Sequence, residues 1–120
     1  MIRSLAILTV AVMIPAKPLP RTVTVTAYCP CERCCEYWAH IPDRQRTFAD
    51  GTRFDRHAKV CAVDTRVFPF GTVFHIPGIG RYVARDRGGD IKGNRIDILF
   101  PTHKQALAWG RRTFTIERKK

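Results

Sequence analysis

YVARDRGGDIKGNRIDILF, residues 82–100, contains two short apolar runs, at 82–84 and 96–100. Asp86 follows the first run and Asp97 lies inside the second. A buried carboxylate is costly unless it is hydrogen-bonded or functional, so both positions are candidates for a site. The residues between the runs include glycines, which allow tight turns: Gly88, Gly89 and Gly93. We predict a strand, a loop and a strand that hold two carboxylates near one cleft.

The composition is that of one globular domain. The chain has 120 residues, of which 45% are hydrophobic and 26% charged. Its formal net charge is +11, which favours an anionic partner such as nucleic acid, a membrane surface or an acidic polymer.

The first residues point to export. Arg3 precedes an uncharged apolar run at 5–14, which is too short to span a bilayer comfortably and is typical of a secretory signal. We expect residues 1–16 to be a signal peptide or N-terminal anchor, 17–21 a linker and 22–118 the folded domain. The alternative for 1–16 is a buried first strand or helix. Export places the protein in the cell envelope or outside the cell, argues against nucleic acid as a partner, and limits membrane contact to an uncleaved leader.

Alternating and apolar segments predict six short strands. RTVTVTAY at 21–28 has the period of two of a half-buried strand. A helix is expected at 102–109, where Thr102 can cap its start and Gly110 can end it. Closure removes exposed strand edges in so small a domain, so we predict a mainly β fold, a small closed barrel. The other strands are expected at 60–64, 81–85, 95–100 and 111–118, and one more at the end of 67–76, after a turn around Pro69 and Gly71.

The cysteines form the strongest local anomaly. Four thiols lie within seven residues, at Cys29, Cys31, Cys34 and Cys35, and Cys61 follows later. Cys31 and Cys34 have the C-x2-C spacing of a zinc knuckle, which another cysteine of this set or His57 would complete. Export also permits disulfides, and because adjacent cysteines do not easily pair, Cys61 would be the partner. We favour a disulfide or free thiols over structural zinc, and a nucleophilic cysteine least.

Several segments taken together resemble the 3D domain, a family named for three aspartates. These segments are VTAYCPC at 25–31, FADG at 48–51, VCAVDTRVFPFGTVFHIPGIG at 60–80, ARDRGGDIKGNRIDILF at 84–100 and ALAWGRRTFTI at 106–116. The family is similar to the C-terminal barrel of membrane-bound lytic transglycosylase A and to RlpA-like double-psi β-barrels. The resemblance covers residues 22–116 and places the three aspartates at Asp64, Asp86 and Asp97. It implies a six-stranded double-psi β-barrel that acts on peptidoglycan glycan strands.

The resemblance also implies roles for these residues. The catalytic acid of the transglycosylase falls on Asp97, and Asp86 matches its supporting aspartate. Asp64 is expected either to tie its turn together or, with the glycine loop, to bind substrate. The other substrate-binding candidates are Gly88, Gly89 and Lys92. The chain departs from the usual family pattern at Asp50, Arg87 and Asp90.

The expected chemistry is cleavage of an O-glycosyl bond without water. Asp97 would protonate the bridging oxygen and then accept the proton of the muramic acid C6 hydroxyl. Its apolar neighbours would favour the raised pKa that this needs. We expect a monomer that requires no cofactor and no metal. The rival readings are a non-catalytic module that binds wall glycan and a zinc-stabilised basic interaction domain.

Overall fold

The computed structural model describes residues 22–35 and 39–115. The predicted leader and linker, 1–21, lie outside the described residues, as do 36–38 and 116–120. Within the described part of the chain, no helix is both long and apolar enough to cross a membrane.

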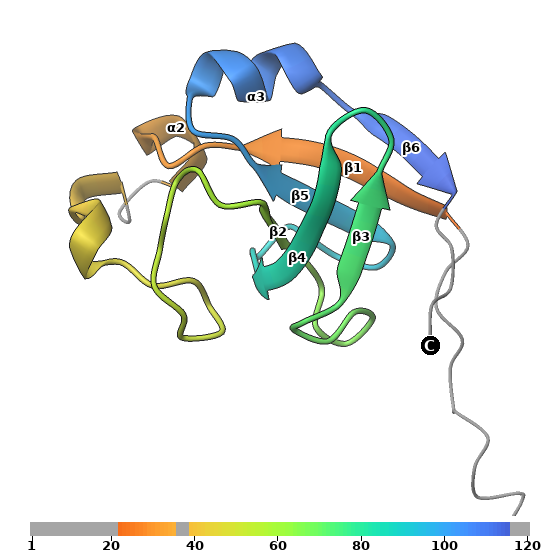
Figure 1. The fold of residues 1–120 in the computed structure, drawn as a ribbon, viewed down its shortest axis with the longest axis horizontal. Helices are drawn as coiled ribbons and strands as arrows, with labels where there is room; N and C mark the ends of the chain where they lie inside the picture. The colour runs from red at the N-terminus through yellow and green to blue at the C-terminus, as the bar shows by residue number, and fades with distance from the viewer. Residues whose placement is uncertain (1–21, 36–38, 116–120) are drawn as a thin grey trace, which may run out of the picture.

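The structure is mainly β, as predicted. Six strands form one sheet, and short helices lie beside it (Figure 1). The strands are β1 (Thr22–Tyr28), β2 (Val60–Ala62), β3 (Val73–Ile76), β4 (Gly80–Asp86), β5 (Arg95–Leu99) and β6 (Arg112–Thr115). The helices are α2 (Glu32–Cys35), the 3-10 turn η2 (Asp43–Gln45) and α3 (His103–Trp109).

The six strands form one sheet that curls into a nearly closed barrel. The order is β3-β4-β2-β5-β1-β6, so neighbours in space are mostly distant in sequence. β1 pairs with β5 and β2 pairs with β4 in parallel, whereas the other pairs are antiparallel. The short β2 therefore lies in the middle, between the two strands that carry the aspartates, β4 and β5 (Figure 1).

The barrel interior holds the main core. β1 sends Val23 and Val25 inward, as its alternation predicted. Trp109 closes one side of this core from α3, and its indole Nε1 donates a hydrogen bond of 3.1 Å to the Val25 carbonyl. Thr102 caps the start of α3 and Gly110 ends it, which confirms the predicted helix.

Part of the long segment between β1 and β2 packs against the barrel. Phe48 and Phe54 pack against Val60 and Leu99 in a second small core. A bridge between Thr47 and Arg53 closes the loop between the two phenylalanines. This loop, residues 46–54, is therefore fixed against the barrel.

Candidate functional site

The two candidate carboxylates lie on the strands that flank β2. Ala62 is the register partner of Asp86 on β4 and also of Asp97 on β5. Adjacent strands are about 4.8 Å apart, so the two aspartate backbones are about 10 Å apart across β2. The pairing of β4 and β5 with β2 thus places Asp86 and Asp97 in one region of the sheet, and of the two only Asp86 lines the pocket described below.

Strand β1 supplies a hydrogen-bond donor to each carboxylate. The hydroxyl of Thr26 donates to Asp97 Oδ1 at 2.9 Å, and the hydroxyl of Tyr28 donates to Asp86 Oδ2 at 2.8 Å. Thr26 and Tyr28 are two residues apart, so they leave the same face of the strand. The site is a four-residue arrangement in which β1 orients both acids.

Asp97 is half-buried, and its surroundings favour the protonated form. Burial raises the pKa of this carboxyl above its ordinary value, and the nearby charge of Asp86 adds to the rise. The Thr26 hydroxyl and the charge of Arg95 oppose the rise without cancelling it. A raised pKa is the direction of shift that a carboxyl acting as a general acid needs.

Asp86 is held from two sides. Besides the Tyr28 hydroxyl, the backbone N–H of Ala49 donates to its Oδ1 at 3.1 Å. Burial, and after it the charge of Asp86, raises the pKa of Tyr28 well above its ordinary value, so the phenol keeps its proton for this bond. Asp86 is accordingly an oriented acceptor at the end of β4.

A pocket of about 440 Å³ opens beside Asp86. One wall is the loop 46–54, and the other includes Asp86 and Arg87. Arg46, which is only 8% exposed, lines the same pocket, with its guanidinium 4.2 Å from the Phe54 ring centroid. The pocket combines aromatic rings, two arginines and one carboxylate.

Asp50 fixes this loop onto β4. Its backbone N–H donates to the Arg85 carbonyl at 3.0 Å, and its carboxylate receives Arg85 Nη1 at 3.2 Å. The hydroxyl of Thr52 also donates to this carboxylate. An aspartate at position 50 therefore serves a structural purpose beside the pocket.

The third aspartate of the series, Asp64, is occupied by its own turn. Its buried carboxylate accepts hydrogen bonds from the Gly93 N–H at 3.0 Å and from the backbone and side chain of Arg66 at 3.1 Å. The Arg66 guanidinium and the Gly93 N–H hold the pKa of Asp64 well below its usual range. These contacts fit the turn-tying role expected for Asp64.

The family model for the 3D domain matches residues 59–117, which include all three aspartates. Residues 59–117 are therefore similar to the 3D domain family. The match is shorter than the resemblance at 22–116 suggested, because β1 and the cysteine segment precede it.

The chain is similar to curated proteins of Bacillus subtilis (strain 168). The chain is 46% identical over 61 residues to YabE, whose name refers to cell wall shaping, and 43% identical over 61 residues to the cell wall-binding protein YocH. It is 35% identical over 68 residues to the prophage-derived protein YorM. These alignments cover 51%, 51% and 54% of the chain but only 15%, 21% and 29% of the relatives. The chain thus spans less than a third of the length of each.

The glycine loop of the 3D domain, residues 87–94, differs in part from expectation. Gly93 has a φ of 66°, which favours glycine, but Gly88 and Gly89 are not among the positive-φ glycines. Gly88, Gly89 and Lys92 are exposed on the loop that joins β4 to β5. Their contact with substrate stays a prediction.

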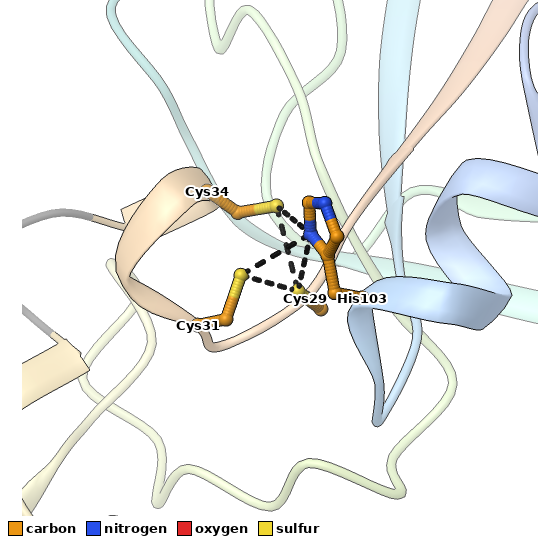
Figure 2. A group of neighbouring side chains, drawn as sticks. All are labelled: Cys29, Cys31, Cys34 and His103. Atoms are coloured by element: carbon orange, nitrogen blue, oxygen red, sulfur yellow. Dashed lines mark hydrogen bonds between the residues drawn. The ribbon is translucent and has the colours of Figure 1, made fainter.

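The cysteines separate into two environments. Cys61 is fully buried in the main core, and all five cysteines, every one of them within the described residues, are free thiols. The expected pairing with Cys61 is therefore wrong, because β2 holds it inside the barrel. Cys29, Cys31 and Cys34 instead gather around His103 of the 3D domain, not His57 (Figure 2).

Three site residues were not predicted from the sequence: Thr26, Tyr28 and His103. The alternation of β1 places positions 26 and 28 on one face, but nothing in the sequence says that this face meets β5 and the end of β4. His103 is 74 residues from Cys29, so spacing gives no sign of it. These contacts arise from strand pairing and from the docking of α3.

Proposed function

We propose that this chain acts on peptidoglycan and cleaves the glycosidic bond between muramic acid and glucosamine. The observation that carries the proposal is the environment of Asp97: a half-buried carboxyl with a raised pKa, oriented by Thr26, on the strand two away from Asp86. The names of YocH and YabE, which refer to cell wall binding and shaping, support the cell wall as the place of action.

Asp97 is proposed to act first as an acid and then as a base. Its proton passes to the bridging oxygen as the bond from the muramic acid C1 to that oxygen breaks. The C6 hydroxyl of the same sugar then attacks C1, and its proton passes to the Asp97 carboxylate. A new C1–O6 bond replaces the broken one, no water is consumed, and Asp97 regains its starting state.

Asp86 is proposed to stabilise the positive charge that develops on the sugar ring. Such transition states resemble an oxocarbenium ion, so a fixed carboxylate lowers their energy. Tyr28 and the Ala49 N–H hold this carboxylate at the pocket wall, which limits the reorganisation needed during the reaction. Tyr28 is thus a positioning residue.

The pocket chemistry fits an anionic wall fragment. Arg46 and Arg87 line it beside Phe48 and Phe54. Peptidoglycan carries carboxylates on its stem peptides and on the muramic acid lactyl group, and arginine binds carboxylates in a two-pronged geometry. The chain's net charge of +11 also favours association with an anionic polymer.

The test is product analysis with two matched variants. The full chain is incubated with purified sacculi, and soluble fragments are identified by mass spectrometry. We expect 1,6-anhydro muropeptides from the wild type and none from Asp97→Asn. Asp90→Asn, which removes an exposed carboxylate from the glycine loop, is expected to release fragments as the wild type does. Equal release by Asp97→Asn and the wild type would refute the role of Asp97.

A wall-binding module is the second candidate function, favoured by the name of YocH and by the double tethering of Asp86. Sedimentation with sacculi separates the two. Binding that survives Asp97→Asn, with no fragments released by any variant, would establish the binding module. Fragments with reducing ends would instead indicate hydrolysis, in which water takes the place of the C6 hydroxyl.

A further inference from the structure

A group of three cysteines and one histidine lies at the end of the barrel where β1 stops. Cys29 directly follows β1, and Cys31 directly precedes the short helix α2. Cys34 lies within α2, and His103 is the first residue of α3 (Figure 2). Their four ligand atoms all lie within 4.8 Å of one another. The side chains converge from three segments on one point.

The distances fit a tetrahedron. The His103 Nδ1 atom is 3.5 Å from the Cys29 sulfur, 3.3 Å from that of Cys31 and 3.7 Å from that of Cys34. The sulfurs of Cys29 and Cys34 are 3.5 Å apart. Zn–S bonds of about 2.3 Å and Zn–N bonds of about 2.0 Å place two sulfurs about 3.8 Å apart and a sulfur and nitrogen about 3.5 Å apart.

One edge is shorter than this ideal. The sulfurs of Cys29 and Cys31 are 2.8 Å apart, which is too long for a disulfide bond of about 2.05 Å. Metal binding would separate the two sulfurs by about 1 Å. A rotation about the Cα–Cβ bond of Cys31, whose side chain is only half-buried, can provide this movement.

The geometry points to a structural zinc site formed by Cys29, Cys31, Cys34 and His103. Three thiolates and one imidazole complete a tetrahedral set and leave no position for substrate, which is the arrangement of structural rather than catalytic zinc. Cys35 lies outside the set, because its thiol donates to the Cys29 carbonyl at 3.3 Å. The assignment of this site does not rest on the wall chemistry proposed above.

The ion would tie together parts of the chain that are far apart in sequence. His103 is 74 residues from Cys29, and its helix packs on β1 through Trp109. Cys29 follows Tyr28, the residue that orients Asp86. Zinc at this point therefore fixes the end of β1 and supports the position of the Tyr28 hydroxyl. Because the ligands meet only in the folded chain, zinc binding also stabilises folding.

The first experiment measures metal in the full chain. The protein is produced in zinc-supplemented medium, purified with a reductant that does not bind metal, and analysed by plasma mass spectrometry. We expect about one zinc per chain, as a closed four-ligand site holds one ion. Replacement by Co²⁺ should give the intense visible bands of tetrahedral cobalt and a near-ultraviolet thiolate charge-transfer band.

Matched variants locate the site. His103→Ala and Cys34→Ser should each weaken zinc binding by about 100-fold or more. This exceeds the effect usual for residues that only form hydrogen bonds with a metal ligand. Cys35→Ser and His57→Ala are the controls, one from the same cysteine segment and one the histidine suggested by the sequence. Both controls should retain full zinc and the cobalt spectrum.

The proposal remains testable even if a ligand variant does not fold, because the metal content and the cobalt spectrum of the wild-type protein test it without any variant. Wild-type protein with five alkylatable thiols, no zinc and no cobalt bands would overturn the proposal. A Cys29–Cys31 disulfide in metal-free protein would also overturn it. So would a loss of zinc from the Cys35→Ser and His57→Ala controls as large as the loss from the ligand variants.

Discussion

The hydrogen bond from Tyr28 to Asp86 gives the sharpest quantitative prediction. Tyr28→Phe removes the hydroxyl that donates to Asp86 Oδ2 at 2.8 Å and leaves the ring in place. A hydrogen bond to a charged group contributes about 1.5–3 kcal/mol. Asp86 is half-buried and keeps the Ala49 N–H at 3.1 Å, so the loss should lie near the lower limit, about 1.5 kcal/mol.

Urea unfolding of the full chain measures this loss. For a domain of this size the denaturant slope is about 1.5 kcal/mol per molar, so the midpoint should fall by about 1 M. Tyr82→Phe is the matched control: its ring is buried in the main core, and its hydroxyl makes no hydrogen bond within residues 22–35 and 39–115. Its midpoint should change by less than about a third of that.

A double-mutant cycle with Asp86→Asn isolates the pair. The two single changes should be non-additive, because each removes the same charged hydrogen bond. Tyr28→Phe should also reduce fragment release from sacculi about tenfold, the equivalent of about 1.4 kcal/mol, whereas Tyr82→Phe should not. If Tyr28→Phe unfolds at the same urea concentration as Tyr82→Phe, the assigned role of Tyr28 is wrong.

Three further outcomes follow from the aspartates and the glycine loop. Burial raises the pKa of Asp97 above the unfolded value of about 3.9, so the stability that its protonated carboxyl contributes is complete below that pH and is lost as the pH rises through the folded pKa. In urea unfolding, Asp97→Asn should therefore gain stability relative to wild type as the pH rises above about 4. The pKa of Asp64 is lowered, so the stability that its ionised carboxylate contributes is present above about pH 3.9 and is lost on acidification. Asp64→Asn should therefore be less stable than wild type at pH 7, and the difference in stability between the two should narrow toward pH 2. An unchanged gap across pH in either variant would contradict the corresponding assignment. Gly93→Ala should lower stability by about 1 kcal/mol because of its φ of 66°, whereas Gly89→Ala, which has open space around it and no positive φ, should not; thermal unfolding compares the two.

Local sequence patterns determined most of the secondary structure. The alternation at 22–28 became β1, with Val23 and Val25 inside the barrel. Thr102 and Gly110 delimit α3, because a capping hydroxyl and a glycine act within a few residues. Asp86 and Asp97 were recognisable as site candidates for a similar reason: a carboxylate beside or within an apolar strand is locally anomalous.

Only the tertiary structure decided which residues meet these acids. The donors Thr26 and Tyr28 reach Asp97 and Asp86 through pairings that span 71 and 58 residues. Tertiary structure also brings His103 to the cysteine group, 74 residues away from Cys29 in the sequence. It places Cys61 in the main core instead. Sequence spacing reports neighbours within a strand or a helical turn, whereas strand order and helix docking follow from burying one shared core. The sequence alone therefore identifies the two acids, and the tertiary structure decides which residues form hydrogen bonds with them.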